Sequence, residues 1–244
     1  MIKFIKYDLK TERKYFLNLI FLGFFLILGS FILSHSGFFL EILKQRQATD
    51  IILITSIVFL LGVNLIYLLK VTYKDFFAPR ADFTFSLPLS SLDFVLGKVI
   101  EVSLFFVVSA GLFTINMKLL GFVIGTNFIF YLVNIFLLDL LGLLWTMFIF
   151  ARMRFRARLS IGEILLAFVI TFIPLIIITN YYGLVATSQG LVLVGNMGLS
   201  FIFPFAISGN NLYKVLSPMV YYFILILIMI GVDSKYIRDN INLI

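Results

Sequence analysis

Few side chains in this 244-residue chain are of types that carry chemistry, and their spacing limits what they can do. The chain has no cysteine and a single histidine, which leaves no thiol chemistry, disulfide or Cys-based metal site. Asp75, Asp82 and Asp93 share one segment, but their spacing of seven and eleven residues matches no metal-binding frame. The only Gly-Lys pair, which ends at Lys98, lacks the other residues of a phosphate-binding loop. We expect no catalytic residue, metal or bound cofactor in this chain.

One carboxylate stands inside an apolar run. Asp139 lies near the middle of Thr126–Phe150, where an ionised carboxylate costs about 2.5–3.5 kcal/mol on insertion scales. Each surrounding Leu, Ile or Phe contributes only ~0.3–0.6 kcal/mol, yet their number still favours insertion. Two interpretations follow. Asp139 faces a translocation path as a proton or substrate site, or it is protonated and hydrogen-bonded within the protein, with Asn134 as a candidate partner.

The composition excludes a soluble domain. Hydrophobic residues make up 62% of the chain and charged residues 13%, so a globule of this size could not hide its apolar surface from water. The net charge of +7 is then a product of membrane topology and of contact with anionic lipids. Nucleic acid is not an expected partner. We expect one transmembrane domain over residues 1–244.

Apolar runs divide the chain into predicted spans. Most are long enough to cross a hydrocarbon core of about 30 Å at ~1.5 Å per helical residue. The six runs are Leu17–Leu33, Ile51–Leu69, Val99–Asn116, Thr126–Phe150, Ile161–Tyr182 and Ser217–Val232. This pattern predicts an all-α integral membrane protein with six transmembrane helices.

Basic residues fall in alternate gaps between these runs. Fifteen of the nineteen Lys and Arg residues precede the first run or follow the second, fourth and sixth. Cytoplasmic loops retain positive charge. We therefore expect a multi-pass protein of the plasma membrane with both termini in the cytoplasm.

Residues 1–16 have the pattern of an amphipathic helix. Ile2, Ile5, Leu9 and Phe16 recur at helical spacing, while the basic residues lie largely on other faces. We expect an interfacial helix in the inner headgroup region. A solvated basic tail that only sets the orientation is the alternative.

The segment 183–216 is predicted to re-enter the membrane from the outer face. Leu191–Ile207 is apolar, but Gly195, Gly198 and Pro204 weaken a continuous helix. A full span here would reverse the charge bias of the flanking loops. A pair of re-entrant half-helices fits better, with a surface loop as the alternative.

Almost thirty residues, 70–98, separate the second and third predicted helices on the inner face. Tyr73, Phe76 and Phe77 are large apolar groups that stand there among charged residues. Such a stretch suits the groove of a soluble partner, in which aromatic and Arg side chains act as anchors. A helix that lies on the lipid surface is an equal alternative on physical grounds.

The end of this segment carries a family resemblance. Residues 83–98 read Phe-Thr-Phe-Ser-Leu-Pro-Leu-Ser-Ser-Leu-Asp-Phe-Val-Leu-Gly-Lys. They resemble the signature of type-2 ABC export permeases, in which Ser-Leu-Pro-(Val/Leu)-Ser runs into (Ile/Val)-Leu-Gly-Lys at the foot of the third helix. That family also has six spans, an N-terminal interfacial helix and a re-entrant pair before the last helix. Ser91 departs from the pattern, because many members have a basic residue there.

The resemblance implies a partner that supplies energy. It implies a separate ATPase in two copies, which binds ATP and Mg, and a second permease protomer, the same chain or a homologous one. It places the coupling helix that docks on the ATPase within Thr72–Asp82. The docking residues implied there are Tyr73, Lys74, Asp75, Phe76, Phe77, Arg80 and Asp82.

The transported substrate is suggested by composition alone. Spans rich in Phe, Leu and Ile suit the export of an amphipathic or hydrophobic molecule, and peptides are one such class. Two competing functions are an integral-membrane enzyme and an ATP-independent facilitator. An enzyme should gather carboxylates, His or Ser–base pairs at one membrane face, and a facilitator should show repeated halves or several polar residues within the spans.

Overall fold

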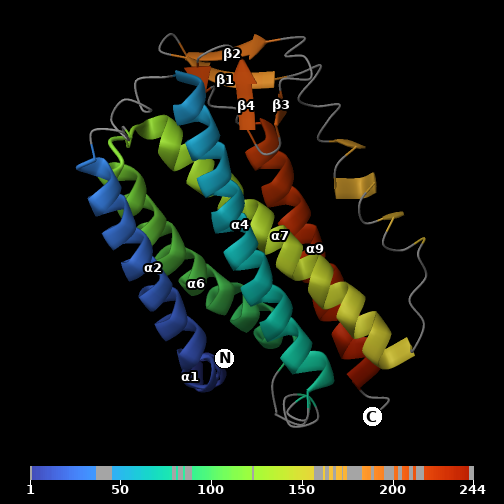
Figure 1. The fold of residues 1–244 in the computed structure, drawn as a ribbon. Helices are drawn as coiled ribbons and strands as arrows, with labels where there is room; N and C mark the ends of the chain where they lie inside the picture. Colours follow the sequence, from blue (N-terminus) through green and yellow to red (C-terminus); the bar gives the residue numbers. More distant parts are fainter. Residues whose placement is uncertain are drawn as a thin grey trace. The chain divides into compact units, whose positions relative to one another are not determined.

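The computed structural model describes most of the chain. The described residues are 2–36, 46–78, 81, 85, 90–122, 124–156, 162, 165–166, 169–171, 173–174, 183–187, 190–194, 201–202, 205–208, 211–212 and 217–241. Helices make up most of them (Figure 1). They are α1 (Ile2–Thr11), α2 (Arg13–Ser34), α4 (Arg46–Phe77), α6 (Ser91–Leu119), α7 (Thr126–Arg156) and α9 (Ser217–Ile241).

Long apolar helices confirm the membrane-like character that the sequence predicts. Four stretches of the described chain are long and apolar enough to cross a membrane. They are Arg13–Leu33, Ser91–Leu119, Phe128–Phe155 and Met219–Asn240. The predicted run Ile51–Leu69 is helical within α4, and most of Ile161–Tyr182 lies outside the described residues. The six-span topology therefore stays a prediction.

The ends of α6 have well-formed capping motifs. Ser90 Oγ accepts a hydrogen bond from the backbone N–H of Asp93 at 3.0 Å, as an N-cap residue does, and it donates to the Asp93 carboxylate at 2.8 Å. At the other end Gly121 has a φ of +85°, and the N–H of Phe122 bonds to the carbonyl of Met117. This is a Schellman motif, for which glycine has the least steric cost.

The chain forms two compact units. Unit 1 comprises Met1–Leu69 and Gly97–Gly125, and unit 2 comprises Lys70–Leu96 and Thr126–Ile244. Both α4 and α6 contribute one part to each unit. In unit 2, α7 and α9 pack along each other through buried aliphatic side chains. Arg152 of α7 lies 5.8 Å from the ring centroid of Tyr236 on α9, within cation–π range.

Unit 1 is held by a series of contacts among α2, α4 and α6. Tyr67 and Phe105 stack with their ring centroids 3.6 Å apart, and Phe16 lies edge-on to both. Further along, Ser109 donates to Asn64 Oδ1 at 3.0 Å. Large apolar side chains face away from these contacts, and Phe21 of α2 is 65% exposed. Such an exposed apolar face suits lipid rather than water.

The N-terminal helix is shorter than predicted. The expected interfacial helix covers residues 1–16, but α1 ends at Thr11 and α2 begins at Arg13. Glu12 between them has φ and ψ of −88° and 5°, which is not helical geometry. Phe16 therefore belongs to the first long apolar helix.

Short strands replace the half-helices predicted within 183–216. β1 (Gly183–Thr187) pairs antiparallel with β2 (Gly190–Val194). β3 (Phe201–Ile202), β4 (Phe205–Ser208) and β5 (Asn211–Leu212) form a second antiparallel group. The re-entrant half-helices are thus wrong for the described residues of this segment. Valine next to leucine favours strands, and a glycine opens each of them, Gly183 in β1 and Gly190 in β2.

Candidate functional site

The predicted docking residues occupy the last turns of α4, in unit 2. Tyr73 is 55% exposed, and its neighbours Lys74 and Phe77 are half-buried. Asp75 and Phe76 are buried. Arg80 and Asp82 lie outside the described residues. This turn therefore presents one face outward and directs the other into the unit.

An aromatic cluster joins this turn to the start of α6 and the end of α7. Its members are Tyr73, Phe76, Phe77, Phe85, Phe94, Phe150 and Phe155. Phe85 lies 5.7 Å from Phe94 and 5.6 Å from Phe155, measured between ring centroids. On the other side of the turn, Phe77 lies 5.4 Å edge-on to Phe150. Edge-to-face pairs of this kind add about 0.5–1.5 kcal/mol each beyond their buried area.

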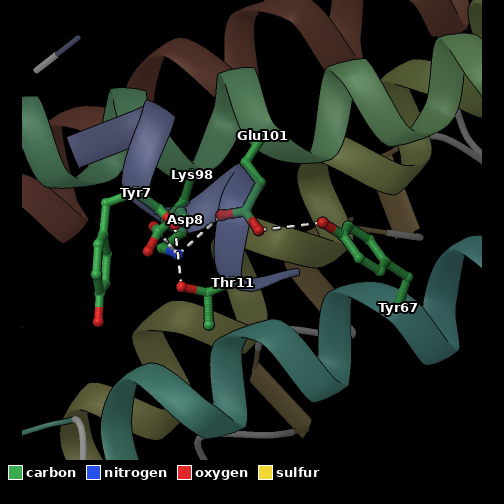
Figure 2. A network of polar contacts seen from close by, with 6 residues as sticks. All are labelled: Tyr7, Asp8, Thr11, Tyr67, Lys98 and Glu101. Carbon is green, nitrogen blue, oxygen red and sulfur yellow. Dashed lines mark hydrogen bonds and ion pairs between the residues drawn. The ribbon is translucent and has the colours of Figure 1, made fainter. Parts of the chain in front are cut away.

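A buried polar network lies at the α1 end of unit 1 (Figure 2). Lys98 Nζ donates to Asp8 Oδ2 at 2.5 Å and to Glu101 Oε2 at 2.8 Å. The Tyr67 hydroxyl donates to the other Glu101 oxygen, Oε1, at 3.0 Å. We call Asp8, Tyr67, Lys98 and Glu101 the Lys98 network. It joins α1, α4 and α6.

The spacing of residues in the sequence indicates only part of the Lys98 network. Lys98 and Glu101 are three residues apart on one helix, a spacing at which opposite charges can pair. Asp8 is not expected, because a carboxylate on a basic amphipathic helix is typical of a solvated position. The available signal is that two carboxylates, Asp8 and Glu12, lie four residues apart at the end of α1 and directly after it. Both carboxylates are buried.

The Lys98 network positions α1 more than it performs chemistry. Its lysine and both carboxylates are almost wholly removed from solvent. Breaking such a buried pair by removal of one partner costs about 3–5 kcal/mol, because the remaining charge stays buried. The network can therefore fix the docking of α1 against α6.

Asp139 is buried in α7, at 4% exposure. Its Oδ2 has no hydrogen-bond partner among the residues that the structure describes. Asn134 donates instead to the carbonyl of Phe130 at 3.0 Å, so the expected bond between Asn134 and Asp139 is not formed. Asp233 of α9 is also buried, and both of its carboxylate oxygens lack partners within the same described part of the chain.

The described residues contain no group of three or more His, Asp or Glu side chains placed to hold a metal ion. Comparison of the chain with protein-family models, with curated proteins and with solved structures gave no match. The resemblance of residues 83–98 therefore remains an expectation from the sequence alone. Within that motif the structure describes Phe85 and residues 90–98, which begin with the Ser90 cap and end with Lys98.

Proposed function

We propose that this chain is the transmembrane subunit of an ATP-driven exporter of the type-2 ABC class. It pairs with a second permease protomer and docks on a separate ATPase, present in two copies, that binds ATP and Mg. In this proposal it lies in the plasma membrane with both termini in the cytoplasm. The resemblance of residues 83–98 and the long apolar helices support it.

The observation that carries the proposal is the arrangement of the α4 end. An aromatic side chain, Tyr73, is exposed on a turn whose opposite face, Phe76, packs on the start of α6. Exposed aromatics backed by a rigid cluster are typical anchors for a protein partner. Tyr73, Lys74 and Phe77 would then contact the ATPase, while Asp75 and Phe76 hold the turn in place.

The aromatic cluster suggests how a movement of the docking turn is transmitted to α7. The segment 70–96 belongs to the same compact unit as α7 and α9. Phe77 and Phe85 contact the last turns of α7 directly, so a displacement of the docking turn displaces α7. ATP would favour one of two states of the paired permeases because it binds that state better.

The substrate in this proposal is an amphipathic or hydrophobic molecule, peptides included. The helices expose Leu, Ile and Phe over most of their outward faces. Asp139 is the residue proposed for the translocation path, because its buried oxygen lacks a partner within the described residues. A second protomer or the substrate could supply the missing hydrogen bond.

Co-purification with an ATPase tests the proposal. The tagged full chain should bring down an ATP-binding-cassette ATPase from its native membrane, and Tyr73→Glu should abolish this. Tyr7→Glu is the matched control, because Tyr7 is also about half exposed but lies on α1. If Tyr73→Glu retains as much ATPase as wild type, the proposal that Tyr73 lies on the docking face is contradicted. Substrate movement by the chain alone, without ATP, would favour the facilitator.

A further inference from the structure

An apolar pocket of about 240 Å³ lies among α2, α4 and α6 within unit 1. Nine of its twelve lining residues are apolar or glycine, and none is charged. The three polar ones are Ser56, Ser109 and Asn116. The pocket is therefore a site for a hydrocarbon group rather than for an ion or a polar headgroup.

Polar pairs hold the helices at both ends of the pocket. Ser109 of α6 bonds to Asn64 of α4 at one end, and Ser30 of α2 bonds to Asn116 of α6 at the other. Between them, α2 approaches α6 so closely that a Cβ at Gly23 would lie 2.6 Å from a Leu112 methyl carbon. The space is consequently bounded by fixed contacts, and the helices do not close over it.

The rim of the pocket belongs to the apolar outer surface of unit 1. Leu22, Leu26 and Phe59 line the pocket and are each exposed by 40% or more. On the same stretch of α2, Phe21 and Phe25 are exposed as well. A pocket whose rim continues into such a surface opens toward whatever covers that surface, which in a bilayer is hydrocarbon.

We infer that this pocket binds one acyl chain of a membrane lipid. An unfilled apolar pocket forfeits dispersion contacts along its whole lining, so an apolar group that enters it is favoured. A peptide is a poorer occupant, because its backbone amides need hydrogen-bond partners at this depth. The Ser109 and Asn116 side chains are already hydrogen-bonded within the protein, whereas an acyl chain needs no such partner. The inference requires α2, α4 and α6 to lie in a bilayer and does not depend on the ATPase.

Photolabelling of the full chain tests this site. The protein is reconstituted in vesicles of phosphatidylethanolamine and phosphatidylglycerol that contain phosphatidylglycerol with a diazirine on its acyl chain. After irradiation, mass spectrometry should find the label concentrated on the pocket-lining stretches of α2, α4 and α6. Label spread evenly over the exposed apolar residues, such as Val107, would overturn the inference.

A filling variant separates the pocket from the general lipid surface. Val63→Phe places a larger side chain in the pocket and should lower labelling there several-fold. Ile66→Phe is the matched control, because Ile66 is three residues along α4 and 56% exposed, and labelling should not change. Ser56→Leu is a second filling variant with the same expected loss, should Val63→Phe unfold.

Two results would refute the assignment to a lipid. In one, the filling variants that fold, judged by an unchanged melting temperature, keep wild-type labelling. In the other, a benzophenone-bearing amphipathic peptide labels the pocket and displaces the lipid probe. The second result would make the pocket a peptide site. Both labelling results can be interpreted even if no ATPase partner is found, because labelling needs neither ATP nor a partner.

Discussion

Lys98 and Asp8 form an ion pair of 2.5 Å although ninety residues separate them in the sequence. Their side chains are only 1% and 5% exposed, and Glu101 shares the same ammonium group at 2.8 Å. In the resemblance to type-2 ABC permeases, Lys98 is the last residue of the motif. In this structure its contacts connect the motif with α1.

Replacement of Lys98 by methionine should destabilise unit 1 strongly. The carboxylates of Asp8 and Glu101 would then stay buried without their ammonium partner, at a cost of about 3–5 kcal/mol. Lys118→Met is the control on the same helix, where the side chain is exposed and a change within roughly 0.5 kcal/mol is expected. Unfolding in a denaturing detergent series measures both. Equal stability of the two variants would contradict the network.

Replacement of Asp8 by asparagine should cost less than loss of Lys98. The lysine keeps its bond to Glu101, so no buried charge is left without an opposite one. The expected loss is about 1–3 kcal/mol, and α1 should become more accessible to protease while the long helices stay protected. Limited proteolysis with mass mapping around Lys10 gives the result. Unchanged protection of α1 would show that Asp8 does not hold the helix.

Two glycines of α2 should respond in opposite ways to alanine. At Gly23 the added Cβ meets the Leu112 side chain at 2.6 Å, so Gly23→Ala should destabilise by about 1–3 kcal/mol. Leu112→Ala in the same chain should recover part of that loss. At Gly29 nothing lies within 4 Å, and Gly29→Ala should stabilise by roughly 0.5–1 kcal/mol through helix propensity. Thermal unfolding of the three variants is the measurement, and a neutral Gly23→Ala would contradict the predicted loss by showing that the Leu112 side chain moves aside without cost.

Asp139 allows a test that separates function from stability. Asp139→Leu removes a buried group that lacks hydrogen bonds to the described residues, so the free energy of unfolding should rise by about 1–3 kcal/mol. Asp139→Asn keeps the shape but not the ionisable group. If Asp139 lines the translocation path, both variants should lose transport in vesicles that contain the ATPase. Full transport by Asp139→Asn would assign Asp139 no proton role.

The contribution of the Ser90 cap to stability can be tested by replacing Ser90, with Ser91 as the control. Ser90→Ala removes the acceptor of the Asp93 N–H and should destabilise by about 0.5–2 kcal/mol. Ser90→Thr should retain most of the stability. Ser91→Ala is the control one residue further, inside α6, where the expected change is small. Chemical unfolding compares the three, and matching losses for Ser90→Ala and Ser91→Ala would exclude the cap.

Sequence patterns sufficed for the long helices because apolar length is a local property. The runs in α2, α4, α6, α7 and α9 can each be read within about twenty residues, which is the span of a bilayer. The Lys98–Glu101 pair was predictable for the same reason, since three residues on one helix fix their distance. Asp8 was not, because no local pattern indicates a partner ninety positions away.

The segment 183–216 shows the opposite limit. Glycines and a proline within Leu191–Ile207 argued against a straight helix, but they are equally common where strands begin and turn. In the described residues β1 and β2 resolve this ambiguity in favour of a hairpin. The aromatic cluster could not be predicted from the sequence either. Phe76 and Tyr73 have similar neighbours in the sequence, but Phe76 is buried and Tyr73 is exposed.

The long sequence separation within the Lys98 network also sets an order of assembly. A ribosome that adds about 5–20 residues per second completes Lys98 roughly 5–20 s after Asp8. Throughout that interval α1 has been synthesised and its lysine partner has not. α1 cannot complete this ion pair until α6 has been synthesised, so correct docking of α1 reports that the later helix is in place.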